Sequence, residues 1–233
     1  SAPLFAALVG GYAAVRVDWS RARGAHGRVQ RKLRSLGSGE RRFVLDTLAF
    51  LVRHERTLGL LVDRAGLSSS ASRAAVERAR CQAALLLHGG LRAEALTGAS
   101  LDWDAVLDPV HTLTGWLRLE DPSAAEALGT AASLPDFLAR RLLELPDPIG
   151  LAAALNRRAP LCLRVNRPSG DRASLLGELP GARPTELASD GLILAGRQDV
   201  FGLPQVQSGL LEVQDEGSQL IAELCAPEPG WQV

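Results

Sequence analysis

The feature that most constrains the fold is a change of hydrophobic pattern near Ala159. Before this residue, apolar side chains recur at the spacing of amphipathic helices. After it, short apolar runs such as Leu161–Asn166 and Gly191–Leu194 alternate with turns that contain glycine and proline, which is typical of strands. The 233-residue chain therefore combines a helical part with a smaller strand-containing part. We predict an α+β fold.

The first part, residues 1–133, is predicted to be an all-helical bundle. Glycines follow two of the helical patterns, and Ser123 and Glu126 have the spacing of a capping box. The helices expected along the chain are Leu4–Trp19, Glu40–Ala65, Arg73–Leu87, Asp102–Leu119, a helix that starts at Asp121–Ser123, Leu134–Leu145 and Ile149–Arg158.

The second part, residues 134–226, is predicted to be a small strand–helix–strand subdomain of RRM-like type, with two or three strands and with its helices on one side. Gly181–Pro184 is expected to be a turn, and Trp231–Val233 the start of a further strand. The expected strands are Leu161–Asn166, Gly191–Leu194 and an extended segment at Ser208–Glu212, and the expected helices are Arg172–Leu179 and Gln214–Cys225.

Charge is balanced overall, with 26 basic and 26 acidic residues, but it is unevenly distributed. A basic block lies between Arg16 and Arg42, where only Asp18 and Glu40 are acidic. Such a block can attract phosphate, and a solvated helix face followed by a loop is the alternative interpretation. The basic residues of this block are Arg16, Arg21, Arg23, Arg28, Arg31, Lys32, Arg34, Arg41 and Arg42.

Cysteine and histidine spacing favours neither a metal site nor a disulfide framework. Cys81, Cys162 and Cys225 are far apart and lie among apolar neighbours, so we expect buried, unreactive thiols. No apolar run approaches the roughly 18 residues of a membrane span. Ser1–Gly11 lacks the basic start of a signal peptide. We therefore expect a cytoplasmic protein without a metal or a membrane partner.

Four segments of the second part resemble the Sun (Fmu) family of bacterial ribosomal RNA cytosine (carbon-5) methyltransferases. The strongest is Gly209–Leu220, with the sequence GLLEVQDEGSQL, which is similar to the family pattern G-x-x-x-VQD-x-x-S-Q-L. The order of the motifs and their separations make the resemblance specific. The other segments are Leu134–Leu138 (LPDFL), Asn156–Asn166 (NRRAPLCLRVN) and Gly191–Leu194 with Val200, and a Pro-x-Pro-Gly motif follows at Pro227.

The first part resembles the helical domain of antitermination-factor type (NusB-like) that many family members carry at the amino terminus. This similarity involves residues 35–65 and is less specific, because other amphipathic helices have a comparable pattern. In the family, residues 227–233 would begin a Rossmann-type methyltransferase domain, which is truncated here. The resemblance thus implies three segments: 1–133, 134–226 and 227–233.

This resemblance implies that the parent protein is an RNA cytosine methyltransferase that uses S-adenosylmethionine. In the family, one cysteine attacks carbon 6 of cytosine, which makes carbon 5 nucleophilic, and a second cysteine helps to release the enzyme. Neither Cys162 nor Cys225 stands in the matching motif, so no catalytic residue is assigned. The 233 residues alone are expected to be inactive and to bind no cofactor. The expected partners are RNA, with ribosomal RNA implied by the family, and the methyltransferase domain of the same protein, but not DNA.

Two groups of site residues follow from the residue types and the resemblance. Arg164 and Asn166 flank Val165 on one strand, so both can face an RNA, where arginine pairs with phosphate and asparagine with a base edge or sugar. A salt bridge or a turn contact is the alternative for this pair. The remaining RNA-binding candidates are Arg28, Arg31, Lys32 and Arg34, and the candidates to face the cofactor domain are Gln214, Asp215, Gly217 and Ser218.

Asp215 has a simple local explanation, because an aspartate before a helix accepts hydrogen bonds from the first backbone N–H groups. Two other functions stay open for the whole chain. One is a stand-alone, non-enzymatic RNA- or protein-binding module of antitermination type. The other is a purely structural domain whose helices pack against a partner.

Overall fold

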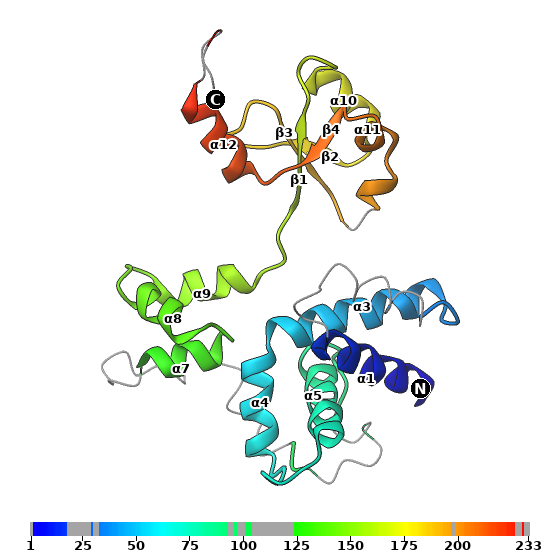
Figure 1. Ribbon diagram of the computed structural model, residues 1–233, viewed down its shortest axis with the longest axis vertical. Helices are drawn as coiled ribbons and strands as arrows, with labels where there is room; N and C mark the ends of the chain where they lie inside the picture. Colours follow the sequence, from blue (N-terminus) through cyan, green and yellow to red (C-terminus); the bar gives the residue numbers. More distant parts are fainter. Residues whose placement is uncertain are drawn as a thin grey trace. The chain divides into compact units, whose positions relative to one another are not determined.

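The computed structural model describes residues 2–17, 29, 33–92, 96, 101–103, 124–196, 199–226 and 230. The chain divides into two compact units, Ser1–Arg157 and Arg158–Val233 (Figure 1). The first is helical in its described residues, and the second contains a small antiparallel sheet with helices, which confirms the α+β class. The three family segments expected from the sequence, with limits at 133 and 226, stay a prediction.

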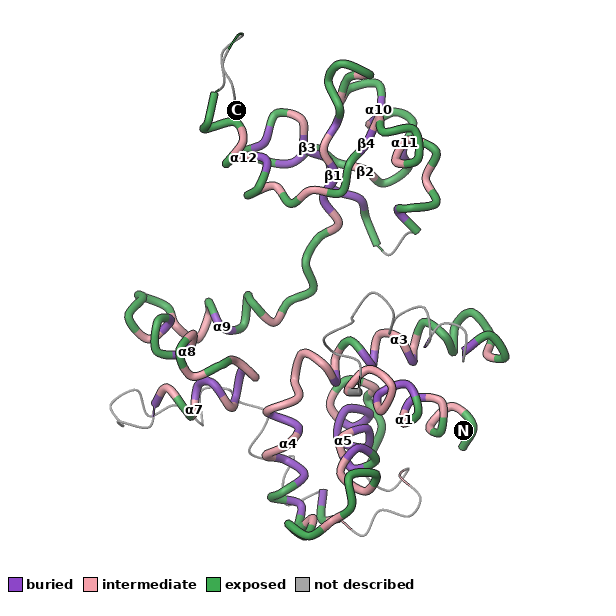
Figure 2. Tube along the Cα trace, viewed as in Figure 1, coloured by how far each residue is buried: buried purple, intermediate pink, exposed green. Residues whose placement is uncertain are grey.

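Helices α1, α3, α4 and α5 of the first unit share one apolar core. Tyr12, Leu51, Leu58 and Leu61 are fully buried in it, and Figure 2 shows the buried stretches of α4 and α5. A second, smaller cluster joins the remaining helices around Leu128. The helices are α1 (Ala2–Val17), α3 (Ser38–Arg53), α4 (Glu55–Arg64), α5 (Arg73–Leu87), α7 (Ala124–Ala131), α8 (Asp136–Leu143) and α9 (Pro148–Asn156).

The single helix predicted over Glu40–Ala65 is wrong, because the chain forms two helices that meet at His54. No glycine or proline marks the break. Instead, the N–H groups of Arg56 and Thr57 donate to Ser133 Oγ at 2.8 and 3.1 Å. A serine 77 residues from Arg56 thus satisfies the first amides of α4, which a local sequence pattern cannot reveal.

Two expected helix features lie outside the described residues. They are the helix at Asp102–Leu119, apart from its first two residues, and the capping serine at Ser123. α7 begins directly after this serine, at Ala124, and carries Glu126 in its first turn. The helices expected at Arg73–Leu87, Leu134–Leu145 and Ile149–Arg158 are confirmed as α5, α8 and α9, with shifts of a few residues for the last two.

The second unit has a four-stranded antiparallel sheet in the order β2-β3-β1-β4. Its core gathers Leu163 and Val165 of β1 with Leu175 of α10 and Leu192 of β3. The elements are β1 (Leu161–Val165), α10 (Arg172–Glu178), β2 (Ala182–Pro184), β3 (Gly191–Leu194), the 3₁₀ turn η4 (Val200–Gly202), α11 (Pro204–Gln207), β4 (Leu211–Val213) and α12 (Glu216–Cys225).

Two expectations for this unit need correction. The turn predicted at Gly181–Pro184 is the edge strand β2, whose Ala182 and Pro184 lie opposite Leu194 and Leu192 of β3. Proline argues against a strand in sequence patterns, yet an edge strand tolerates it. The sheet therefore has four strands, and its helices do not share one side. α10 contributes Leu175 to the core, whereas α12 packs on β1 through Gln219, whose Nε2 donates to Leu163 O.

A tight junction joins α4 to α7 and α8 in the first unit. Arg56 Nη1 donates to Leu134 O at 2.8 Å and to Asp136 Oδ1 at 2.6 Å. The hydroxyl of Thr57 donates to Thr130 O at 2.8 Å. Gly129 leaves the room for this arrangement, since a Cβ there would lie 2.7 Å from Arg56 Nη1 and 2.9 Å from Leu134 O.

We predict that Gly129→Ala lowers the free energy of unfolding of the chain by about 1–3 kcal/mol, because the added methyl group forces backbone and side chain apart. The matched control is Gly10→Ala in α1, where a Cβ would meet nothing within 4 Å. That substitution should be neutral or stabilise by about 0.5–1 kcal/mol. Urea unfolding followed by circular dichroism measures both. Equal effects of the two substitutions would show that close packing at Gly129 does not stabilise the junction of α4 with α7 and α8.

The ring of Phe50 lies between two histidines, 4.3 Å from the His54 ring and 4.8 Å from the His88 ring between centroids. Burial, and then the nearby Arg53 and His88, lower the pKa of His54 from 6.5 to about 4. Protonation of His54 is therefore unfavourable in the folded chain.

We predict that the free energy of unfolding falls as the pH drops from about 6.5 to about 4, because unfolded His54 binds its proton first. His54→Gln should reduce this slope and leave the pH dependence of stability above that window unchanged. Thermal unfolding at a series of pH values measures the effect. An unchanged slope in the variant would show that other groups cause the loss.

Candidate functional site

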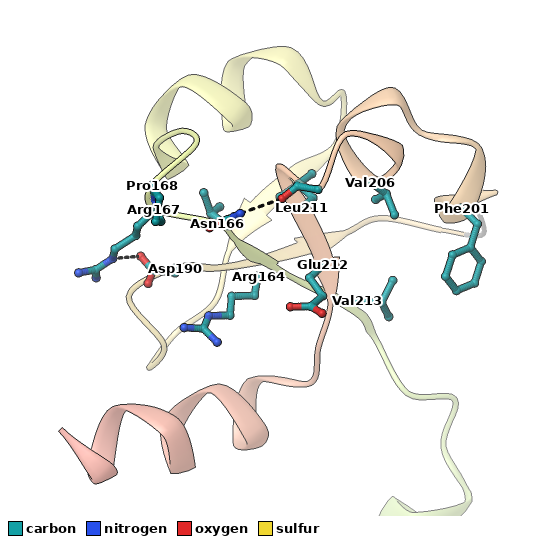
Figure 3. A pocket seen from close by; sticks show the side chains of 12 residues that line it. Arg164, Asn166, Arg167, Pro168, Asp190, Phe201, Val206, Leu211, Glu212 and Val213 are labelled. Atoms are coloured by element: carbon teal, nitrogen blue, oxygen red, sulfur yellow. Dashed lines mark hydrogen bonds and ion pairs between the residues drawn. The ribbon is translucent and has the colours of Figure 1, made fainter. Parts of the chain in front are cut away.

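An open groove of about 850 Å³ follows the edge strand β4 in the second unit (Figure 3). It is formed by the end of β1, by β4 and by the η4–α11 segment. Its lining residues are Arg164, Val165, Asn166, Arg167, Pro168, Asp190, Phe201, Val206, Gly209, Leu211, Glu212 and Val213. The groove brings together the two RNA-binding candidates of the second part with residues that the sequence did not single out.

Arg164 reaches the groove because its neighbours on β1 are fixed in the core. Leu163 and Val165 are almost completely buried, so the side chain between them points to the opposite face of the sheet. Across the strands, Arg164 lies opposite Glu212 of β4. Among the described residues, no acceptor lies within hydrogen-bonding or ion-pair distance of its guanidinium. This cation is therefore available to a ligand.

Asn166 is exposed just beyond β1 and ties the strand to a turn. Its Nδ2 donates to Gly209 O at 3.1 Å, and its backbone N–H donates to Leu210 O at 3.0 Å. The turn contact considered from the sequence therefore accounts for this amide nitrogen. A contact of Asn166 with RNA stays a prediction.

The salt bridge considered for this strand end is made by a different residue, Arg167. Its Nε donates to Asp190 Oδ1 at 2.6 Å and its Nη2 to Ser189 Oγ at 2.7 Å. The Asp190 carboxylate, as hydrogen-bond acceptor and as charge, raises the pKa of Arg167. Arg167 thus holds the 189–190 segment beside the groove. Arg164 and Arg167, three residues apart in the sequence, therefore have different surroundings.

The other flank of the groove is apolar. Phe201 of η4 is 71% exposed, and Val213 at the end of β4 is 42% exposed. Figure 3 shows Phe201, Val206 and Val213 on one side of β4, and Arg164, Arg167 and Asp190 on the other. The family motifs include Val200 of η4, but no sequence pattern singles out Phe201. The one available signal was an aromatic residue in a polar connecting segment.

Asp215 caps α12, as predicted, with its carboxylate accepting from Gly217 N–H at 3.1 Å. Gly217 and Ser218 are exposed on the first turn. Gln214 Oε1 is buried and has no hydrogen-bond partner among the described residues. These four candidates therefore cluster at the start of α12. Their orientation toward a cofactor domain stays a prediction.

Two glutamates of α12 hold the loop between β2 and β3. Glu216 Oε1 accepts from the N–H groups of Leu187 and Ala188 at 2.7 and 3.1 Å. These amides lower the pKa of Glu216. Two turns further along, Glu223 Oε1 accepts from the Ser189 N–H and hydroxyl groups. α12 is therefore attached to the sheet mainly by polar contacts, and it leaves Ile221 and Leu224 exposed.

The basic block is only partly within the described residues. Arg34, Arg41 and Arg42 are exposed. Arg16 instead forms an ion pair with Glu55 at 3.0 Å and lies over the ring of Tyr12. The remaining candidates Arg28, Arg31 and Lys32 lie outside the described residues.

The cysteines differ in their surroundings. Cys81 and Cys162 are buried, and burial raises the pKa of Cys81 to about 12 and also raises that of Cys162. Cys225 is exposed at the last residue of α12, so the expected burial is wrong for this residue. Among the described residues no cluster of side chains suits a metal ion, and no helix is long and apolar enough to cross a membrane.

Comparison with known proteins finds similarity to two relatives of the same name. The chain is 40% identical over 87 residues to ribosomal RNA small subunit methyltransferase B of Pseudomonas putida, and 38% identical over 87 residues to the enzyme of that name from Pseudomonas syringae pv. tomato. Each match covers 36% of this chain but only 20% and 19% of the relatives. No family model matches the chain.

The crystal structure of PH0851 is similar in fold, with a TM-score of 0.63, and the match covers 96% of this chain and 56% of that protein. Sequence identity is 15%, so this likeness concerns the fold alone. The resemblance to ribosomal RNA methyltransferases inferred from the motifs is confirmed by the two Pseudomonas relatives for part of the chain. Because the matched part spans about a fifth of those relatives, their activity does not transfer directly.

We predict that Glu216→Ala accelerates amide hydrogen exchange at Leu187 and Ala188 and lowers the thermal midpoint of the second unit, because two N–H groups lose their acceptor. Since the folded-state pKa of Glu216 is lowered, its contribution is present above the usual glutamate pKa and is lost as the pH falls through the folded-state value. Glu212→Ala is the control, because Glu212 accepts no such bond from a described residue. Unchanged hydrogen exchange at both amides would show that the Glu216 carboxylate does not hold the loop between β2 and β3.

Proposed function

We propose that this chain is the substrate-positioning region of an S-adenosylmethionine-dependent ribosomal RNA cytosine (carbon-5) methyltransferase. The observation that carries the proposal is the 40% identity to a ribosomal RNA small subunit methyltransferase. The motif order from Asn156 to Leu220 gives the same assignment from the residues themselves. In this proposal the 233 residues bind RNA and carry no catalytic group.

The groove along β4 is the proposed RNA-binding site of the second unit. Arg164 supports this role, because it is a guanidinium without an intramolecular partner among the described residues, beside an open groove. Arginine suits a phosphate because its fork of N–H donors pairs with two oxygens. Asn166 is the second candidate here. Its amide nitrogen donates one hydrogen bond to Gly209 O.

The beginning of α12 is the proposed boundary with the methyltransferase domain. Gln214, Asp215, Gly217 and Ser218 are the residues proposed to face it. Two observations support this: the buried Gln214 Oε1 lacks a partner among the described residues, and Ile221 and Leu224 of the same helix are 66% and 84% exposed. S-adenosylmethionine would bind to that domain and not to the residues described here, so no methyl transfer is expected from the chain alone.

The basic block is proposed as a second RNA contact. The exposed Arg34 supports it, and Arg28, Arg31 and Lys32 extend it in the sequence. Arg16 is excluded from this contact by its pair with Glu55. A protein that acts on ribosomal RNA is expected in the cytoplasm, and DNA and membranes are not proposed as partners.

We predict that the chain binds ribosomal RNA fragments with an affinity that falls as salt rises. Arg164→Gln should weaken binding and reduce the slope of log affinity against log salt by about 0.7, because one phosphate contact is lost. Arg183→Gln is the matched control, since Arg183 is an exposed arginine of the same sheet that does not line the groove. Fluorescence anisotropy at several salt concentrations measures both variants.

Absence of salt-dependent RNA binding by the wild-type chain would contradict the proposal and favour a structural domain that packs against a protein. RNA binding that is equally weakened by both substitutions would place the contact elsewhere on the sheet. Transfer of a labelled methyl group from S-adenosylmethionine to RNA by the chain alone would contradict the absence of catalytic groups. If the affinity for RNA stays the same when a methyltransferase domain is added, the stand-alone antitermination-type module is favoured.

A further inference from the structure

The apolar flank of the groove carries the aromatic ring of Phe201, whose backbone is anchored by its neighbours in the chain. Val200, the residue before Phe201, is 7% exposed and belongs to the core of the second unit. The following turn is closed by the Gly202 N–H, which donates to Asp199 O at 3.1 Å, and by the Leu203 N–H, which donates to Val200 O at 3.2 Å. The backbone therefore holds Phe201 in place.

The ring itself has few neighbours. Phe201 is 71% exposed although its backbone lies in a hydrogen-bonded turn, so its exposure is a property of the folded unit. Burying a phenylalanine side chain is worth about 1.5–3 kcal/mol, and leaving it in water forgoes that stabilisation. Together with Val206 and Val213, the ring forms an apolar flank in the groove, and contiguous apolar surface of this kind is typical of ligand-binding grooves.

The groove offers different chemistry on its two flanks. Arg164 lies on one flank of β4, and Phe201 with Val206 and Val213 lies on the other (Figure 3). A nucleotide has the same division, with a charged phosphate and a flat base that has an apolar face. Stacking on an aromatic ring requires an unpaired base, because the faces of paired bases are covered by their neighbours in the helix.

We propose that Phe201 is the stacking residue of this groove and that its ligand is a single-stranded RNA segment that crosses β4. One unpaired base lies on the Phe201 ring, and a neighbouring backbone phosphate pairs with Arg164. This inference rests on the proposed function, because it names the form of RNA that the same groove accepts. It assigns a role to a residue that none of the quoted motifs includes.

The test compares binding of a single-stranded RNA of about ten nucleotides with binding of the same sequence in a duplex. Phe201→Ala should weaken binding of the single strand by about tenfold or more and leave duplex binding nearly unchanged, while Phe201→Trp should restore it. A fluorescent adenine analogue in the single strand should be quenched by the wild-type chain and not by Phe201→Ala.

Phe137→Ala is the matched control, because Phe137 of α8 is 70% exposed and does not line the groove. This substitution should leave RNA affinity unchanged. Circular dichroism of each variant verifies that the chain remains folded, and the tryptophan variant separates loss of stacking from loss of structure.

The outcomes distinguish the inference from the proposed function. If Arg164→Gln weakens binding and Phe201→Ala does not, RNA binding stands and the stacking role is overturned. If Phe201→Ala weakens binding of single strand and duplex equally, the ring does not select an unpaired base, and the inference is also overturned. If the wild-type chain binds neither RNA, the proposed function fails, and the exposed ring is then assigned to a protein contact.

Discussion

The second unit depends on the position of β1, which hydrogen-bonds to β3 on one side and to β4 on the other. With both edges paired, the strand cannot shift by one residue without moving Leu163 and Val165 out of the core. This fixed register places Arg164 on the opposite face and opposite Glu212. It also brings Asn166 to the turn at Gly209. The arrangement of the groove thus follows from strand pairing, and Asn166 and Arg167 tie the adjoining segments to the strand end.

The two faces of the sheet are covered by different means. α10 packs with apolar side chains, with Leu175 in the core, whereas α12 is held by Gln219, Glu216 and Glu223. Polar attachment of α12 leaves its apolar side chains Ile221 and Leu224 outside the unit. A helix attached in this way can belong to its sheet and still present an apolar surface to another domain. The proposed role of the α12 start at a domain boundary is consistent with this division.

The sequence predicted those elements whose determinants are local. β3 was expected at Gly191–Leu194 and α5 at Arg73–Leu87, and both have these bounds, because a buried apolar run and a clear amphipathic pattern define them. The break at His54 was missed, since the amides of α4 are capped by Ser133, far away in the sequence. β2 was missed because its strand character comes from pairing with β3. Such long-range contacts leave no local pattern.

The same distinction applies to the site. Arg164 was recognised from its motif, but the motif could not show that Arg167, three residues on, takes up the ion pair with Asp190. Phe201 was missed because its connector has no periodicity, and only the folded chain brings it beside β4.

The charges of the groove explain why an apolar contact matters there. Arg164 and Arg167 are balanced by Glu212 and Asp190, so the groove has no net excess of cations. Binding driven by counterion release grows with the number of phosphates neutralised, and a balanced groove offers little of it. A single available guanidinium can position a phosphate but gives modest affinity on its own. Stacking on Phe201 supplies binding free energy that needs no net charge, and it depends on an unpaired base. A groove of this composition should therefore discriminate between single-stranded and paired RNA more than between sequences.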